Sequence, residues 1–166
     1  MFEKVLRVFM KIRVFYTGGN EGMIKPLSDA LYEFYHLKTF NNANLELIAP
    51  AYNAKRKQYD AAALLEYLIR IKGNEIALWV VARDMYCKDM DYVFGYAAQR
   101  YGAVLSVHRL RSADLVMKEA LHEVGHVLGL RHCSNRCFMR FSNTLEEAQS
   151  KPYRLCETCM SLVKTE

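Results

Sequence analysis

The sequence predicts an α/β fold with a mostly parallel sheet. Segments with strand-like and helix-like patterns alternate in the order β-α-β-α-β-β-β-α, which is typical of a parallel sheet with helices packed on it. Residues 76–82 form a nearly continuous apolar run, as expected of a strand buried on both faces. The 166 residues, 52% of them hydrophobic, suffice for one domain with a sizeable core and exclude a mainly disordered chain.

The first two predicted elements are a strand and a helix. Residues 5–16 are rich in Val, Phe and Ile and are followed by Gly18 and Gly19, a pattern that indicates a strand and a turn. Residues 27–37 carry apolar side chains at helical spacing, and Pro26 stands where a helix can begin. We therefore expect a helix over residues 27–37.

A second strand and a second helix follow. Residues 45–48 predict a short strand that stops before Pro50. Residues 58–71 predict an amphipathic helix, and Gly73 provides the stop after it. The apolar face predicted for this helix consists of Ala62, Leu65, Leu68 and Ile69.

Two strands and a long helix complete the predicted fold. Residues 92–98 and 103–109 are strand candidates separated by a short polar turn, so we expect one antiparallel strand at the edge of the sheet. Ser112 can cap a helix over about residues 112–128, which has an acidic residue in its first turn. Beyond this helix the chain is rich in cysteine, and we expect it to be irregular.

The elements predict a single domain over residues 1–166. The segment 1–129 forms an N-terminal subdomain that ends with the long helix, and 130–166 forms a C-terminal subdomain. No apolar run approaches the roughly 18 to 20 residues that span a bilayer, and charged residues interrupt the apolar N-terminal segment, unlike a secretory signal. We therefore expect a cytoplasmic protein without a membrane partner. The net charge of +5 is mild and its basic residues are scattered, so no nucleic-acid partner is expected.

One motif, HEVGHVLGLRH, contains three of the five histidines. His122 and His126 are four residues apart, so a helix places both imidazoles on one face, where they can bind one ion. Glu123 can hold a water molecule beside that ion. Gly129 can adopt a positive φ that ends the helix and returns His132 to the ion as a third ligand. Three neutral imidazoles leave a fourth position for water, which is typical of catalytic zinc.

Four cysteines near the end of the chain predict a second metal site. Cys133 and Cys137 form one close pair, and Cys156 and Cys159 form another. Two such pairs can surround one tetrahedral zinc ion, and four sulfur ligands leave no position for water, so this site would be structural. Two disulfides are the competing interpretation, which the lack of a secretory signal disfavours. Cys87 stands alone, and we expect a buried or idle thiol rather than a redox switch.

With these residues the chain resembles the metzincin metallopeptidases, whose long motif is HExxHxxGxxH. Among metzincins it is most similar to the archaemetzincins, in which the histidine motif is followed by CxM and a terminal CxxC. Here the counterparts are Cys-Phe-Met at residues 137–139 and Cys-Glu-Thr-Cys at residues 156–159. Upstream, the Tyr-Val-Phe-Gly sequence at residues 92–95 resembles the start of the family's edge strand. The resemblance implies a metzincin-like sheet with one antiparallel edge strand, an active-site helix and a short zinc-stabilised C-terminal subdomain.

The resemblance also implies roles for further residues. Met139 takes the position of the Met-turn, an apolar floor beneath the metal site that does not bind zinc. Phe141 stands where some metzincins have an additional tyrosine ligand, and it has no hydroxyl to offer. The strand that would line the upper side of the substrate cleft, and with which an extended peptide could pair, contains Val93, Phe94, Gly95 and Tyr96.

The expected function is zinc-dependent hydrolysis of peptide bonds in a single catalytic domain. A zinc-bound water would be the nucleophile and Glu123 its general base. We expect two zinc ions, a peptide or protein substrate and a monomer, and an aminopeptidase or another narrow specificity stays open. The alternatives are a catalytically weak or inactive zinc-binding module with a protein or nucleic-acid partner, and a metal store or sensor. Glu123 favours the enzyme, because a purely structural three-histidine site does not need a carboxylate there.

Overall fold

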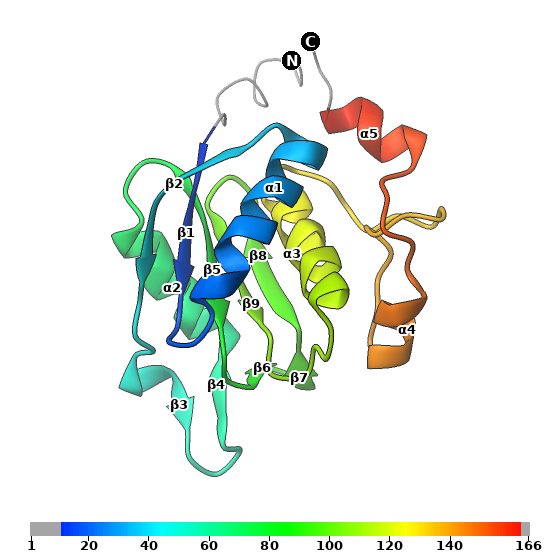
Figure 1. Cartoon of the computed structure of the whole chain (residues 1–166). Helices are drawn as coiled ribbons and strands as arrows, with labels where there is room; N and C mark the ends of the chain where they lie inside the picture. The colour runs from blue at the N-terminus through cyan, green and yellow to red at the C-terminus, as the bar shows by residue number, and fades with distance from the viewer. Residues whose placement is uncertain (1–10, 164–166) are drawn as a thin grey trace.

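The computed structural model describes residues 11–163 and places two sheets in them (Figure 1). The main sheet has the strand order β2 (Lys38–Asn44), β1 (Lys11–Tyr16), β5 (Ile76–Val81), β9 (Gly102–Ser106) and β8 (Gly95–Ala98). Its strand pairs are parallel except for β8 with β9, which pair antiparallel at one edge. The predicted fold class, a mostly parallel sheet with one antiparallel edge strand, is therefore confirmed.

Helices cover both faces of the main sheet. α1 (Ile24–Tyr35) and α3 (Ala113–Val127) pack on one face and α2 (Ala61–Ile71) packs on the other (Figure 1). All of β5 is buried, and its alternate side chains enter the two cores: Leu78 lies under α1 and α3, whereas Trp79 lies under α2. This burial on both faces explains the continuous apolar run from which the strand was predicted.

The predicted strand at residues 45–48 is wrong. The second strand is β2, which precedes that segment and has the polar sequence KTFNNAN. β2 is an edge strand with no buried residue, so its sequence lacks the apolar pattern by which strands are recognised. Leu45, Leu47 and Ile48 are partly buried against the core under α2, but in irregular backbone before the short 3₁₀ helix η3 (Ala49–Ala51).

Two predicted strands and the first two helices differ from the structure at their ends. The segment 92–98 is divided at Phe94 between two strands of different sheets. The strand predicted over 103–109 is β9, which ends at Ser106. α1 begins in the turn before the predicted start, directly after the 3₁₀ helix η2 (Glu21–Met23), and the first-strand residues 5–10 lie outside the described residues.

α2 begins later than predicted because its cap lies inside the predicted helix. Asp60 is the N-cap residue, and its carboxylate accepts hydrogen bonds from the amides of Ala62 and Ala63. The buried face is also rotated from the predicted one: Leu64 is fully buried, whereas Ala62 is exposed. The residues before this cap are extended and belong to the second sheet.

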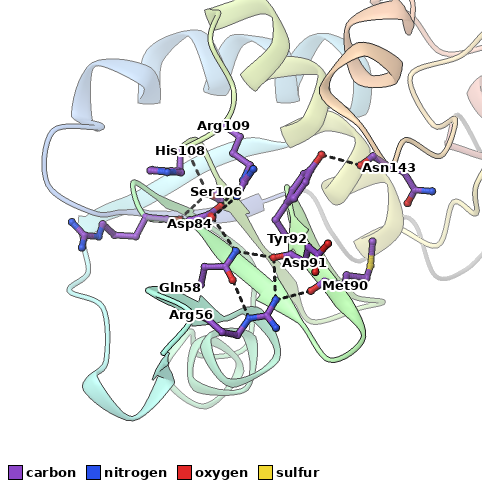
Figure 2. A network of polar contacts seen from close by, with 11 residues as sticks. Arg56, Gln58, Asp84, Met90, Asp91, Tyr92, Ser106, His108, Arg109 and Asn143 are labelled. Carbon is purple, nitrogen blue, oxygen red and sulfur yellow. Dashed lines mark hydrogen bonds and ion pairs between the residues drawn. The ribbon is translucent and has the colours of Figure 1, made fainter. Parts of the chain in front are cut away.

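The second sheet was not predicted, and it is small. Its order is β3 (Tyr52–Asn53), β4 (Gln58–Asp60), β6 (Met85–Cys87) and β7 (Met90–Val93). Because the strands of this sheet are short, side chains also connect them (Figure 2). The Arg56 guanidinium donates to the Met90 carbonyl at 3.0 Å, and the Gln58 amide donates to Asp84 at 2.9 Å. Arg109, just beyond β9, donates twice to the same carboxylate at 2.8 Å, so Asp84 joins the two sheets.

The chain after α3 contains two short helices, where irregular structure was predicted. α4 (Leu145–Ser150) and α5 (Glu157–Val163) lie beside α3 on one side of the molecule (Figure 1). Thr144 and Glu147 form a reciprocal capping box at the start of α4. The buried Lys118 of α3 donates to three carbonyls at and beyond the end of α4, those of Ala148, Gln149 and Lys151. These bonds fix the C-terminal segment to the long helix.

No helix among residues 11–163 is long and apolar enough to cross a membrane.

We expect Asp84→Asn to destabilise the fold in a pH-dependent way. Partial burial raises the pKa of the Asp84 carboxyl, but hydrogen bonds from Arg109 and Gln58 outweigh burial and hold the pKa below its usual value. A lowered pKa stabilises the folded state above the pKa of the unfolded chain, and this contribution is lost as the pH falls through the folded-state pKa. The variant should therefore lose about 1 kcal/mol of unfolding free energy at pH 7.

Urea denaturation at several pH values measures this difference. The gap from wild type should shrink below about pH 4. Asp89→Asn, which changes an exposed carboxylate in the turn between β6 and β7, is the matched control and should show no such gap. An equal loss at pH 7 and at pH 3 would contradict the assigned role of the ionised carboxylate.

Candidate active site and metal centres

The helix α3 carries the first two predicted ligands. Ser112 caps the helix as predicted: its hydroxyl accepts a hydrogen bond from the Leu115 amide at 3.2 Å. His122 and His126 lie one turn apart near the helix end, and their Nε2 atoms are 3.1 Å from each other. At this separation both nitrogens can bind the same ion.

The other nitrogen of each ring is fixed by the backbone. Nδ1 of His122 lies 2.9 Å from the Phe138 carbonyl oxygen, and Nδ1 of His126 lies 2.8 Å from the Leu130 carbonyl oxygen. A carbonyl oxygen can only accept a hydrogen bond, so each Nδ1 must be the donor. Both Nε2 atoms are then unprotonated and free to bind a metal, the arrangement found for metal-bound histidines.

The turn at Gly129 brings the third histidine to the first two, as predicted. Gly129 has φ = 101°, and the Leu130 amide donates back to the Gly125 carbonyl at 2.9 Å, which ends the helix sharply. The His132 ring then lies 4.7 Å from the ring of His126, between centroids. One ligand nitrogen from each of the three rings lies within 4.8 Å of the others. This geometry and donor set fit one zinc ion, and its binding stays a prediction.

The environment keeps the three imidazoles neutral. Burial lowers the pKa of His122 well below its usual value, and the positive charge of Lys151 acts in the same direction. Burial also lowers the pKa of His126 and of His132. Only the neutral imidazole has a lone pair for a metal, so this environment favours metal binding at neutral pH.

Glu123 lies beside the histidines, buried between α3 and the edge strand β8. Its carboxylate occupies the space where a side chain on Gly95 would be: a Cβ atom there would lie 2.6 Å from Oε1 of Glu123. Burial, together with the negative charge of Glu119, raises the pKa of Glu123 to about 8. Glu119 forms an ion pair with Lys151 at 2.5 Å, and both side chains are almost fully buried.

This ion pair was missed by the sequence analysis. Glu119 is four residues before Glu123, so helical periodicity places both carboxylates on one face of α3, and that spacing was the available signal. Nothing in the sequence pointed to Lys151, which comes from the segment after α4.

Met139 is fully buried and packs against the active-site helix. Its sulfur lies where a side chain on Gly125 would be, 2.5 Å from the position of such a Cβ. The preceding carbonyl, that of Phe138, accepts from His122, and the Met139 carbonyl accepts from the Cys133 amide at 3.0 Å. The structure therefore places Met139 against α3 next to the histidine cluster. Phe141 lies 5.0 Å from the His132 ring, between centroids, and is half exposed.

The four C-terminal cysteines meet in one cluster. Their sulfur atoms all lie within 4.8 Å of one another, and none of the five cysteines forms a disulfide. Backbone amides donate to three of these sulfurs at 3.4 Å: those of Cys133, Cys137 and Cys156. Partial burial raises the pKa of Cys156, but these and neighbouring hydrogen bonds outweigh it and lower the pKa to about 6. Four converging sulfurs with N–H donors fit a tetrahedral zinc ion.

A cleft of about 500 Å³ opens in front of the histidines. All four residues predicted for the upper side of the cleft line it, but they do not form one strand. Gly95 and Tyr96 belong to β8, whereas Val93 ends β7, and Phe94 lies between the two strands. β8 pairs with β9 on one side and is the last strand of the sheet, so its other side faces the cleft. The opposite wall includes the segment 141–143, and Cys87 also lines the cleft.

Comparison with known proteins agrees with this architecture. The model of peptidase family M54 matches residues 41–165. An archaemetzincin from Archaeoglobus fulgidus is 39% identical over 162 residues, which cover 93% of this chain and 99% of that protein. The archaemetzincin crystal structure from Methanopyrus kandleri has a TM-score of 0.86 at 31% identity, over 93% of each chain. That from A. fulgidus, in complex with malonate, has a TM-score of 0.83 at 37% identity, over 92% of this chain and 99% of that one.

The fold, the clustered histidines and these relatives define a zinc metallopeptidase. The chain belongs to peptidase family M54. The resemblance to archaemetzincins noted from the motifs is thereby confirmed, and the matching structures cover 92% and 93% of the chain.

We expect Gly95→Ala to impair peptide hydrolysis without removing zinc. The added methyl group would occupy the position of the Glu123 carboxylate and force it to move, while the three histidines keep their places. Displacing the Glu123 carboxylate by about 1 Å should lower kcat about a hundredfold. The measurements are peptide hydrolysis and zinc content by elemental analysis. Gly22→Ala is the matched control, because a methyl group there meets nothing within 4 Å. Wild-type kcat in Gly95→Ala would refute the tight fit.

Proposed function

We propose that His122, His126 and His132 hold the catalytic zinc ion of this metallopeptidase and that Glu123 is its general base. The observation that carries the proposal is the convergence of one ring nitrogen from each of three histidines in the cleft that also contains the Glu123 carboxylate. When bound, zinc supplies Lewis acidity, which lowers the pKa of water and stabilises negative charge on a carbonyl oxygen.

The residues of the chain perform the remaining steps. Glu123 is placed to take a proton from the attacking water and to deliver it to the leaving amine. Its pKa of about 8 is that of the site without an ion, and the positive charge of a bound zinc ion would favour the ionised carboxylate that a base requires. Its carboxylate is confined by Gly95, so it does not have to be ordered when the substrate binds. The substrate peptide is proposed to lie extended along the free side of β8, where backbone N–H and C=O groups can pair with it.

We propose further that Cys133, Cys137, Cys156 and Cys159 bind a second, structural zinc ion, so that the chain carries two. The support is the tight sulfur cluster and its N–H donors. Cys133 directly follows His132, and this site would fix the loop that carries the third histidine. Residues 130–166 then act as a C-terminal subdomain of a single catalytic domain. We propose that the protein is a cytoplasmic monomer without a nucleic-acid partner. The mild net charge of +5 supports the absence of a nucleic-acid partner.

The first test replaces the proposed base. Glu123→Gln keeps the shape of the side chain but cannot accept the proton, so hydrolysis should fall by about 100- to 10,000-fold while zinc content stays at the wild-type level. A diverse peptide mixture, incubated with each zinc-loaded protein and analysed by mass spectrometry, measures this. Glu146→Gln, an exposed acid in the first turn of α4, is the control. Equal cleavage by Glu123→Gln and wild type would sink the assignment of the base.

The second test removes the proposed structural site. In the double variant Cys156→Ser/Cys159→Ser, zinc content should fall from two ions per chain to one, and the melting temperature should fall with it, because structural zinc stabilises the fold. Elemental analysis and calorimetry measure the two effects. Cys87→Ser is the matched control and should retain both ions. Full zinc content in the double variant would show that the cluster does not bind metal.

A further inference from the structure

A hydrogen bond between its two walls crosses the cleft beyond the start of β8, and two further lining residues, Met90 and Cys87, lie past it along the strands. Tyr92, in β7, reaches across from the side of the edge strand, and its hydroxyl donates to the Asn143 carbonyl at 3.1 Å (Figure 2). Both residues line the cleft, and they come from segments that lie on opposite sides of α3 in the sequence. We call this contact the Tyr92–Asn143 bridge.

The bridge is held from both sides. The Arg109 guanidinium lies 4.0 Å above the Tyr92 ring, and it is itself held by two hydrogen bonds to Asp84 (Figure 2). On the other wall, the Asn143 amide donates to Glu147 at 2.6 Å, within the capping box of α4. Each partner is therefore anchored by a second contact behind it.

The distance from the bridge to the reacting groups can be estimated by counting residue steps along each wall of the cleft. Along the upper wall, three residue steps separate Gly95, which contacts Glu123, from Tyr92, or about 10 Å at most in extended chain. Along the lower wall, the Phe141 ring contacts His132, and two residue steps of about 7 Å lead from Phe141 to Asn143. An extended peptide advances about 3.3 Å per residue, so about three residues fit between the reacting groups and the bridge.

At the other end the turn after β8 contacts the end of α3 and not the segment 141–143: the Arg100 amide donates to the Val127 carbonyl at 2.8 Å, and the Gln99 side-chain nitrogen lies 2.9 Å from where a Cβ on Gly129 would be. This end is lined by Gln99, just beyond β8, and by Arg131. Within residues 11–163 neither side chain forms a hydrogen bond or ion pair to the opposite wall. The cleft is therefore asymmetric: the Tyr92–Asn143 bridge joins the edge-strand side to the segment 141–143 beyond the start of β8, and no such bond joins the described residues of these two walls beyond the end of β8.

We propose that the Tyr92–Asn143 bridge limits the substrate to about three residues on the carboxyl side of the scissile bond, so that the enzyme releases short C-terminal fragments. This inference rests on the proposed function. Its direction follows from strand pairing: an antiparallel pair with β8 is the more stable arrangement, and it directs the C-terminal end of the peptide toward Tyr92. Residues on the amino side would extend past Gln99 without a limit.

The test uses ligands whose register is fixed by a zinc-binding group. One series of alanine-based hydroxamates extends from the zinc toward the C-terminus by one to six residues, and a mirror series extends toward the N-terminus. Isothermal titration calorimetry with the zinc-loaded protein gives Kd for each ligand. We expect Kd of the first series to rise at least about tenfold once the length exceeds three residues. The mirror series should show no such rise.

Two variants test whether the Tyr92–Asn143 bridge causes the limit on ligand length. Tyr92→Ala removes the wall and should restore the affinity of the longest ligands to within about threefold of the shortest ones. Tyr92→Phe keeps the ring and its stacking on Arg109 but loses the hydrogen bond, so it should give an intermediate limit. Tyr101→Ala, at an exposed tyrosine that is not part of the cleft lining, is the matched control. Unchanged affinity for the one-residue ligand verifies that each variant is folded.

The proposal is overturned if long ligands of the first series bind wild type as tightly as short ones. It is equally overturned if the loss occurs in the mirror series, or if Tyr92→Ala leaves the limit in place. Because binding is measured without turnover, failure of the proposed function looks different: peptides would stay uncleaved by wild type while the length limit in Kd persists. Cleavage that depends on Glu123, together with affinity that is independent of length, would retain the function and reject the bridge.

Discussion

The sharp end of α3 at Gly129 decides where the rest of the site can lie. A continuing helix would carry His132 away from His122 and His126, and only the left-handed backbone at Gly129 returns the chain within reach. The same turn places the Leu130 carbonyl against Nδ1 of His126 and so fixes the tautomer of a neighbouring ring. One backbone conformation thus ends the helix, orients one candidate ligand and delivers another.

Buried charged side chains connect α3 to the segment that follows it. Desolvation makes an isolated buried ammonium or carboxylate costly, so such groups persist in a fold only when they are paired. Lys118 meets this requirement with three carbonyls near the end of α4, and Lys151 meets it with Glu119. Both pairs connect the helix to the segment that carries Met139 and the cysteines. The ion pair also brings a positive charge close to Glu123, which opposes the effect of burial on its pKa.

The features that could be predicted from the sequence are those encoded by local spacing. The HExxH spacing, the glycine after the helix and the two cysteine pairs each place like groups together by backbone geometry alone, and the structure brings these groups together. The apolar run of β5 is similar, because burial on both faces leaves a direct mark on composition.

What could not be predicted depends on contacts between distant segments. β2 is polar because it lies at an edge, and the second sheet consists of strands of two to four residues held by side chains such as Arg56 and Asp84. The short helix α4 depends on its capping box and on Lys118 more than on an apolar stripe. Gly95 was assigned to the edge strand for its backbone, whereas its missing side chain is what admits Glu123.

The two walls of the cleft are built on different principles, and this difference shapes what the site can accept. The part of the upper wall formed by β8 is a strand of the main sheet, so it offers the same backbone groups at every step and does not distinguish one peptide sequence from another. The lower wall includes the irregular segment 141–143, which offers no such regular backbone, so we expect discrimination between peptides to come from its side chains. Phe141, which is half exposed and lies beside His132, offers a large apolar side chain on that wall. We therefore expect selectivity to lie in the loop between Met139 and α4, which the capping box and the proposed structural zinc would hold in place.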